Sequence, residues 1–402
     1  MKDIRDNFPF FRENKNTIYF DNASTSQKPQ IVIDAMNNYF TKYCANAGRG
    51  SYIIANQVTK EVEEVREKVK KFINAHSVQE VIFTSGATAS LNTVANSWGL
   101  HNLKNGDEIM VCLDDHDSST LPWMHLQNTL TNLGVTIKIV LFKNTSAGDV
   151  NIEDITSKIT NKTRLIAVTH IHNVYGVKTD VEYLRAKIGK DILISLDVAQ
   201  SIGHIPVDAQ KLGVDFLSFS GHKMFASTGV GVLWIDERIH DQIHPFIVGG
   251  GVTTDRNTTE VFYKKLPFLL EGGTGNLAGI IALGTAIDFI NNISIDEIDQ
   301  RLTTLSQYLL AKLRTIQKIE FLPGIAFCKC AVGYGTIAFN ITGLSSQEVG
   351  FVLNEQRIFV RSGTHCTGGG NPLNDSVRVS MHIYNTEEEI DTFVDVLSKI
   401  TD

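Results

Sequence analysis

The chain contains few cysteines, and their arrangement excludes a disulfide-stabilised fold. Five occur among 402 residues, at positions 44, 112, 328, 330 and 366. Because the number is odd and the spacing forms no framework, we expect free thiols in a reducing compartment, the cytoplasm. The pair Cys328 and Cys330 supplies too few ligands for a zinc site by itself, and we expect no metal.

The sequence also lacks the features of membrane and nucleic-acid-binding proteins. No apolar run approaches the roughly 18 residues that a membrane-spanning helix requires. The first residues lack the apolar core of a signal peptide. The formal net charge is −7, whereas binding to a phosphate backbone requires a basic surface. We therefore expect neither a membrane nor a nucleic acid as a partner.

The order of the apolar segments predicts an α/β fold with two domains. Short apolar runs, typical of buried strands, cover residues 81–83, 109–112, 135–141, 165–169, 192–196, 216–219 and 231–234, and helical patterns separate them. This alternation predicts a mostly parallel sheet of seven strands with helices on both faces. A helical region at about 277–317 should lead to a smaller C-terminal α+β domain with strands near 335–341 and 357–361.

The same patterns predict the domain boundaries. Residues 1–20 form an N-terminal arm that joins the small domain, residues 21–280 form the large domain, and residues 281–402 form the small domain, which carries Cys366. The segment 246–276 is rich in glycine and threonine, and we expect it to form loops around a site.

Two residues that follow predicted strands point to a cofactor. Lys223 lies in the segment 218–224, directly after the apolar run 214–217. Burial there lowers the pKa of the amine and makes it a usable nucleophile. Asp197 ends the run 192–196, where an acid can keep a pyridinium nitrogen protonated. A lone Lys after a strand is usually a solvated surface residue, and a lone Asp is often a helix N-cap. The two in this order favour pyridoxal 5′-phosphate (PLP), which uses a Lys Schiff base and an acidic partner for its ring nitrogen.

A turn of small residues after the first strand of the sheet suits a phosphate group. The strand 81–83 leads into the segment 84–90 and then into a helical pattern through Leu91 and Trp98. A strand, a small-residue turn and a helix together aim backbone N–H groups at an anion. Many α/β proteins have such a turn for packing only, so the motif alone leaves both interpretations open.

Four polar residues directly follow predicted strands: His116, Asn173, Asp197 and Lys223. Ligands of parallel sheets bind at the carboxyl ends of the strands, so we expect these four to share one site. The acidic residues on either side of His116 suggest a divalent metal, but ligands so close in sequence cannot all face one ion. An imidazole stacked on a pyridine ring fits the site better.

A second group of candidate site residues lies near the C-terminus. Cys366 follows His365 in a glycine-rich loop near Arg361, where basic neighbours and partial exposure favour a nucleophilic thiolate. An incidental loop cysteine is an equally good interpretation of the spacing. Arg378 lies within the apparent strand 376–380, where a buried guanidinium suits a substrate carboxylate or forms a structural ion pair.

These motifs occur in one order along the chain. They are Tyr19-Phe20-Asp21-Asn22-Ala23, Asn46-x-x-Arg49-Gly50, Thr169-His170-Ile171-x-Asn173, Asp197-x-Ala199-Gln200, Ser220-Gly221-His222-Lys223, Glu271-x-Gly273-Thr274-x-Asn276, Val360-Arg361-x-Gly363-x-His365-Cys366 and Tyr384-Asn385-Thr386. As a set, they resemble the class V aminotransferase family of fold-type I PLP-dependent transferases. The branch they resemble is that of SUF-type cysteine desulfurases and selenocysteine lyases.

The resemblance implies a role for each matching residue. Lys223 would hold the cofactor covalently and move the substrate Cα proton, Asp197 would pair with the pyridinium, and His116 would stack on the ring. Gln200 would contact the phenolic oxygen of the cofactor. The other implied cofactor contacts are Ala87, Thr88, Asn173, Ser220 and His222, with Thr274 donated by the other subunit of a homodimer.

The resemblance also implies a reaction. The carboxylate of L-cysteine or L-selenocysteine would be held by Arg378 and Asn173, with Asn22, Arg361 and His365 as further substrate-binding residues. Cys366 would attack the substrate sulfur and become a persulfide, and alanine would be released. The sulfur would pass to an acceptor protein for iron–sulfur cluster assembly or another thiolation route.

Several positions differ from the branch pattern and leave other activities open. They include Gly48, Ser85-Gly86-Ala87, the neighbours of His116, and Thr364 before His365. The alternatives are a selenocysteine lyase, a cysteine sulfinate or C–S lyase, and a specialised class V enzyme. A non-catalytic sulfur-relay or scaffold protein is a further alternative, against which the intact Lys223 and Asp197 argue.

Overall fold

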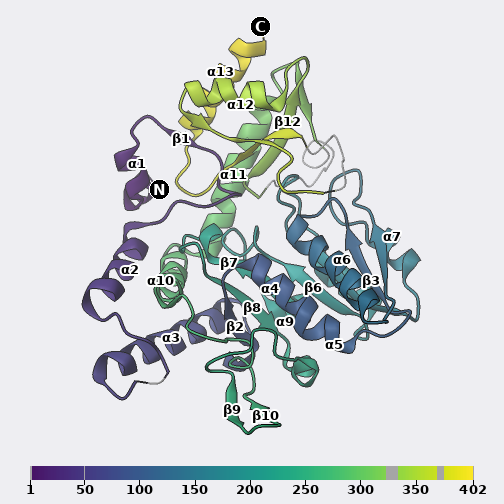
Figure 1. Cartoon of the computed structure of the whole chain (residues 1–402). Helices are drawn as coiled ribbons and strands as arrows, with labels where there is room; N and C mark the ends of the chain where they lie inside the picture. Colours follow the sequence, from purple (N-terminus) through teal and green to yellow (C-terminus); the bar gives the residue numbers. More distant parts are fainter. Residues whose placement is uncertain (1, 49, 323–333, 369–374, 402) are drawn as a thin grey trace.

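The computed structural model describes residues 2–48, 50–322, 334–368 and 375–401. Three residues named from the sequence, Arg49, Cys328 and Cys330, lie outside this part. Figure 1 shows a large sheet and its helices in the lower part of the view and a smaller unit in the upper part, connected by the long helix α11 (Ile295–Leu313).

The large unit is built on a seven-stranded sheet with the order β2-β8-β7-β6-β5-β3-β4. Its strands are β2 (Val81–Thr84), β3 (Glu108–Cys112), β4 (Lys138–Phe142), β5 (Thr163–Thr169), β6 (Leu193–Asp197), β7 (Phe216–Ser220) and β8 (Gly231–Ile235). Neighbouring strands are parallel except for β8, which is antiparallel to both β2 and β7. The predicted mostly parallel sheet is confirmed.

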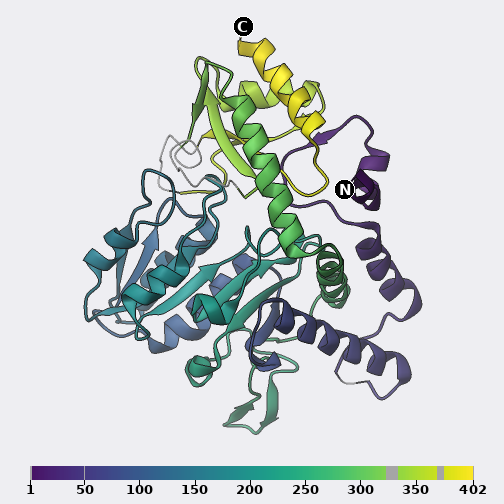
Figure 2. The same cartoon turned by 180° about the vertical axis from the view of Figure 1, so that it is seen from behind.

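Both faces of this sheet are buried, because successive side chains of a strand point to opposite sides. In β5, Ile166 and Val168 belong to one apolar cluster and Leu165 and Ala167 to another. The first face packs against α3 (Ile53–Phe72), α7 (Ile152–Lys158), α8 (Val181–Ile188) and α10 (Leu277–Ile293), and the second against α4 (Ala87–Val94) and α6 (Asp117–Asn132) (Figure 2). Cover on both faces explains why the strands are apolar almost throughout.

The smaller unit has a four-stranded antiparallel sheet of order β11-β12-β15-β14. Its elements after α11 are β11 (Ile319–Phe321), β12 (Thr336–Ile341), α12 (Ser346–Glu355), β13 (Ile358–Phe359), β14 (Arg361–Gly363), β15 (Ser376–Ser380) and α13 (Glu387–Thr401). At the start of α13, the Thr386 hydroxyl accepts the N–H of Glu389, and the Glu389 carboxylate accepts the N–H of Thr386. This reciprocal pair of hydrogen bonds forms a capping box.

The N-terminal segment reaches the smaller unit. Strand β1 (Ile18–Tyr19) pairs in parallel with β13, so that Ile18 lies opposite Ile358. The domain boundaries themselves stay a prediction. The remaining elements are η1 (Lys2–Asn7), α1 (Pro9–Glu13), α2 (Gln30–Lys42), η2 (Val78–Glu80), η3 (Ala95–Gly99), α5 (Leu100–Asn102), α9 (Ala209–Leu212), η4 (Gly221–Lys223) and η5 (Glu237–Gln242).

Two segments differ from the expectation. The helical region at about 277–317 is two helices, α10 and α11, bent by 73° at Ser294, whose φ is +82°. Within the described ranges, no helix by itself is long and apolar enough to cross a membrane. The segment 246–276, expected as loops, contains the antiparallel hairpin of β9 (Thr253–Arg256) and β10 (Val261–Tyr263).

Candidate active site

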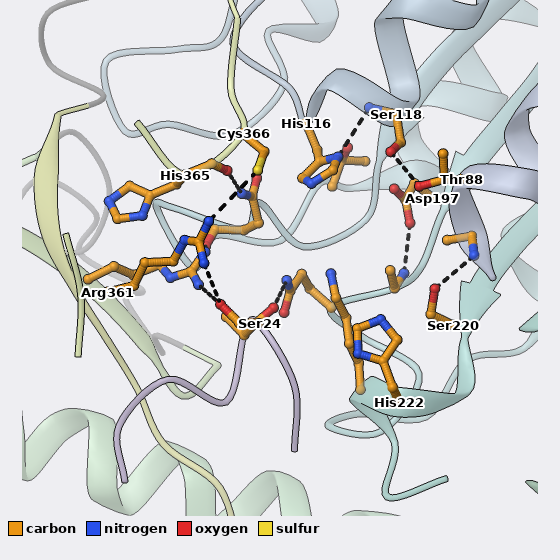
Figure 3. A pocket seen from close by; sticks show the side chains of 18 residues that line it. Ser24, Thr88, His116, Ser118, Asp197, Ser220, His222, Arg361, His365 and Cys366 are labelled. Atoms are coloured by element: carbon orange, nitrogen blue, oxygen red, sulfur yellow. Dashed lines mark hydrogen bonds between the residues drawn. The ribbon is translucent and has the colours of Figure 1, made fainter. Parts of the chain in front are cut away.

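A cavity of about 260 Å³ lies at the carboxyl edge of the large sheet, where the smaller unit meets it (Figure 3). The large unit lines it with Ala87, Thr88, His116, Ser118, Thr169, Asn173, Asp197, Ala199, Gln200, Ser220, His222 and Lys223, the N-terminal segment with Ala23 and Ser24, and the smaller unit with Arg361, His365, Cys366 and Arg378. The structure therefore brings together every site residue named from the sequence except Asn22 and Thr274.

Lys223 lies at the end of the short turn η4, which directly follows β7. Burial lowers the pKa of its amine to about 8, while the negative charge of Asp197 opposes that shift. A lysine with such a pKa is neutral in a larger fraction of molecules at neutral pH than a solvated one. The amine is thus suited to act as a nucleophile and as a base.

Asp197 is the last residue of β6 and is buried. Its Oδ1 accepts the N–H of Ala199 at 2.8 Å, and its Oδ2 accepts the Ser119 hydroxyl at 3.3 Å. No ion pair to Asp197 occurs among the described residues. A buried carboxylate without a cationic partner is costly, so the site suits a protonated ring nitrogen. No helix follows Asp197 directly, and the alternative N-cap interpretation is wrong.

The end of the cavity away from Arg361 and Cys366 has the features of an anion site (Figure 3). Helix α4 begins at Ala87, whose N–H donates to the Ser220 hydroxyl at 2.7 Å. The hydroxyls of Thr88 and Ser118 lie 2.7 Å apart. The buried Nδ1 of His222 has no hydrogen-bond partner in the described part of the chain. A helix N-terminus, two hydroxyl groups and an unpaired imidazole nitrogen fit a phosphate group.

His116 is the N-cap residue of α6, and its Nδ1 accepts the N–H of Ser118 at 3.1 Å. Because Nδ1 is an acceptor, the proton of the neutral ring is on Nε2. Burial, and then the positive charge of Lys223, lower the pKa of this imidazole. His116 therefore presents a neutral ring to the cavity.

The smaller unit supplies two arginines to the same cavity. Arg378 of β15 is buried, and its Nη2 donates to Ser24 Oγ at 2.9 Å and to Asp21 Oδ1 at 3.1 Å. Its Nη1 donates to the carbonyl oxygen of Asn173 at 3.2 Å. Its Nε and the Oδ1 of Asn173 are buried without partners among the described residues. The predicted structural ion pair exists, yet hydrogen-bonding groups remain for a carboxylate.

Cys366 is exposed on the loop that follows β14. The Nη2 of Arg361 lies 3.9 Å from its Sγ, and Figure 3 shows this sulfur directed toward the cavity. The loop is fixed to the large unit, since the N–H of Asp117 donates to the carbonyl oxygen of Cys366 at 2.9 Å. The thiol is therefore held beside the start of α6.

His365 does not support the thiol directly. Its Nε2 lies 3.0 Å from the hydroxyl of Ser376, and Figure 3 shows the imidazole turned away from the sulfur of Cys366. Burial lowers the pKa of this ring to about 3, so it is neutral. The backbone of His365 faces the site instead, because its carbonyl oxygen accepts the amide of Asn173 at 3.0 Å.

Two residues expected in the site lie elsewhere. Asn22 is fully buried at the junction of the units, where its amide donates to the Ser380 carbonyl at 2.8 Å and its Oδ1 accepts the Tyr384 hydroxyl. Both ends of this side chain are occupied, so its expected substrate contact is not supported. Thr274 bonds to Asn46 outside this cavity, and its contact with a partner subunit stays a prediction.

Five residues that line the cavity were not among the site residues predicted from the sequence: Ala23, Ser24, Ser118, Thr169 and Ala199. Ser24 directly follows the quoted motif of residues 19–23, but a single serine there carries no signal of its own. Ala23, Thr169 and Ala199 belong to quoted motifs, and the position of Thr169 at the end of β5 was the available signal. Ser118 lies in the first turn of α6, two residues after His116.

Comparisons with known proteins show the family to which the chain belongs. The family model described as Aminotransferase class-V matches residues 18–393. A probable cysteine desulfurase of Borreliella burgdorferi is 38% identical over 421 residues, covering 100% of this chain and 96% of that protein. The apo structure of a cysteine desulfurase from Thermococcus onnurineus NA1 is 34% identical with a TM-score of 0.91, covering 100% of this chain and 98% of that one.

A more distant solved structure shows the same fold. It is a C-DES variant with glycine covalently linked to its PLP cofactor, 21% identical over 98% of each chain, with a TM-score of 0.83. The family model and the close relatives both extend over nearly the whole sequence. The resemblance seen in the motifs is confirmed: the chain belongs to the aminotransferase class-V family.

Proposed function

We propose that this protein is a PLP-dependent cysteine desulfurase, which converts L-cysteine to L-alanine and retains the sulfur on Cys366. One observation supports the proposal above all. A single cavity combines the amine of Lys223, the buried carboxylate of Asp197 and the thiol of Cys366. The first two come from the large unit and the third from the smaller one, so both units are needed for the reaction.

The residues of the large unit suit the cofactor. Asp197 would hold the ring nitrogen, Gln200 the phenolic oxygen and His116 the face of the ring. The start of α4 with Ser220 and His222 would hold the phosphate. The bound cofactor supplies an aldehyde that bonds to amines and a ring that stores the electrons of a substrate carbanion.

The chain's own groups then account for substrate binding and sulfur transfer. Arg378 and Asn173 would bind the substrate carboxylate, and Lys223 would take the proton from Cα. The thiolate of Cys366 would attack the substrate sulfur. A new S–S bond forms and the Cβ–S bond breaks with its electron pair going to Cβ. Protonation of Cβ and return of a proton to Cα then yield alanine.

We also propose a homodimer in which Thr274 reaches the partner's phosphate site, and an acceptor protein that takes the persulfide sulfur. The support is the resemblance, together with the fact that Thr274 is not among the described residues that line the cavity of its own chain. A nucleophilic thiol functions only while it is reduced, which supports the cytoplasm as the compartment.

The test compares substrates and cysteine variants of the purified protein reconstituted with PLP. We expect alanine and a persulfide from L-cysteine, loss of both with Cys366→Ala, and unchanged turnover with Cys44→Ala, since Cys44 is an exposed thiol on the α2–α3 connection. Normal desulfuration by Cys366→Ala would refute the persulfide role. Turnover of L-selenocysteine or L-cysteine sulfinate without L-cysteine would instead identify a related lyase.

A further inference from the structure

Lys28 is a buried lysine that the proposed reaction does not use, and it contacts the turn that carries His222 and Lys223. Nζ of Lys28 donates to the carbonyl oxygen of His222 at 2.8 Å and to Oγ1 of Thr25 at 3.3 Å, and it also bonds to the carbonyl oxygen of Ser26. All three partners are neutral oxygen atoms. No carboxylate pairs with Lys28 among the described residues, and burial alone lowers the pKa of its amine to about 7.

The carbonyl oxygen of His222 accepts hydrogen bonds from several donors besides Lys28. It also accepts the N–H of Ser26, the hydroxyl of Ser26 and the hydroxyl of Thr25, each at 3.1 Å. The N-terminal segment is thereby hydrogen-bonded to the turn that carries both His222 and Lys223. If Lys28 were removed, three donors to this carbonyl would remain, so the structural bond is redundant. What the other donors cannot replace is the charge.

That charge lies on the side of the cavity that suits an anion. His222 lines the cavity, and its buried Nδ1 has no partner in the described ranges. Burial, and then the positive charges of Lys223 and Lys28, lower the pKa of His222 to about 4. Among the lining residues, Lys223, Arg361 and Arg378 are cationic side chains and Asp197 is the carboxylate. A buried ammonium added to this excess is costly unless an anion binds.

We propose that Lys28 is a positioning residue for the phosphate of the cofactor, acting through the His222–Lys223 turn and supplying a positive charge that only the bound anion compensates. This inference rests on the proposed PLP-dependent function. It assigns to Lys28 no contact with the substrate and no part in proton transfer. Its consequence is that Lys28 lowers the stability of the cofactor-free protein and raises affinity for a phosphorylated ligand.

The experiment separates the charge from the hydrogen bonds by using two ligands. The cofactor-free protein is titrated with PLP and with pyridoxal, which has the same ring and aldehyde but no phosphate. We compare the wild type, Lys28→Met, Lys28→Gln and Lys28→Arg. The matched control is Lys42→Met, which removes an exposed lysine from the last turn of α2.

We expect Lys28→Met and Lys28→Gln to weaken PLP binding about tenfold, which is the size of one partly screened charge interaction, and to leave pyridoxal binding unchanged. Lys28→Arg should recover part of the loss, and Lys42→Met should bind both ligands as the wild type does. The melting temperature of cofactor-free Lys28→Met should equal or exceed that of the wild type, so that PLP raises it by a smaller amount.

Equal losses of affinity for PLP and for pyridoxal would show that Lys28 only stabilises the turn through its hydrogen bonds, which would overturn the inference. The inference would also be overturned if Lys28→Met and Lys28→Gln both bound PLP with wild-type affinity. If Lys28→Met does not fold, Lys28→Gln and Lys28→Arg still distinguish charge from shape. Failure of the wild type to bind PLP would overturn the proposed function as well, whereas wild-type binding with unchanged variants would overturn this inference alone.

Discussion

Arg361 of β14 and Arg378 of β15 lie directly opposite each other in the antiparallel pairing of these strands. Like charges at such positions repel. Nη1 of Arg361 lies 3.5 Å from Oγ of Ser24 and Nη2 of Arg378 lies 2.9 Å from the same oxygen. Asp21 is the one carboxylate in the described part that forms an ion pair with Arg378. Two opposed guanidiniums with a single counter-charge form a site for one more anion, which fits the carboxylate of an amino acid.

Replacing Arg378 by lysine should weaken substrate binding. Lysine keeps the charge but loses the planar fork that reaches Ser24, Asp21 and a carboxylate together. We expect KM for L-cysteine to rise about 10- to 100-fold, with unchanged PLP affinity because Arg378 lies at the other end of the cavity. Steady-state kinetics and a cofactor titration check this, with Arg314→Lys, exposed at the end of α11, as the control. An unchanged KM would show that Arg378 serves only its ion pair with Asp21.

Ser24 should set how firmly the two arginines are held. Its hydroxyl donates to Asp21 Oδ1 at 2.7 Å, which leaves its lone pairs for the two guanidiniums. We expect Ser24→Ala to raise KM by about tenfold, because hydrogen bonds to charged groups are among the stronger ones, with little change in kcat. Ser24→Thr keeps the hydroxyl and should stay close to the wild type. A lower KM in Ser24→Ala would show instead that the serine competes with the substrate carboxylate.

Asp115 should make stability depend on pH. Its carboxyl group is buried, neither oxygen has a hydrogen-bond partner among the described residues, and burial raises its pKa to about 7. The folded protein then holds this proton between about pH 4 and 7 while the unfolded chain releases it, so this group lowers the free energy of unfolding as pH rises through that window.

Asp115→Asn removes that dependence. The variant should gain stability relative to the wild type between pH 4 and 7, and the difference should level off above pH 7. Melting temperatures of both proteins across this range test the sign. The control is Asp114→Asn, a partly exposed neighbour. A constant difference at every pH would show that Asp115 does not titrate in this window.

Hydrophobic periodicity and the order of residues along the chain predicted the part of the site that lies at strand ends. Asp197 ends a strand and His116, Asn173 and Lys223 each follow one, and the parallel sheet brings strand ends to one edge. The contribution of Ser24 depends on contacts between the N-terminal segment and the smaller unit. These contacts join residues far apart in the sequence, so no local sequence pattern predicts them. The substrate contact expected of Asn22 stays a prediction that the structure does not support, because this residue lies at the junction of the units. The bend at Ser294 carries no proline or glycine as a signal.

Gly86 should be required for the anion site through its backbone conformation. Its φ is +151°, and a Cβ added there would lie 3.2 Å from Oγ of Ser220, the oxygen that accepts the N–H of Ala87. Alanine is strained in this conformation and would push Ser220 away from the start of α4.

We expect Gly86→Ala to lower PLP affinity about tenfold or more and to lower the free energy of unfolding by about 1–3 kcal/mol. Gly134→Ala is the matched control, since Gly134 has a φ of +82° with no atom near an added Cβ. It should cost about 1 kcal/mol of stability and leave PLP affinity unchanged. Cofactor titration and thermal unfolding of both variants separate backbone strain, which the two share, from damage to the phosphate site, which only Gly86→Ala should show. Equal PLP affinities in the two variants would mean that the α4 turn does not bind the phosphate.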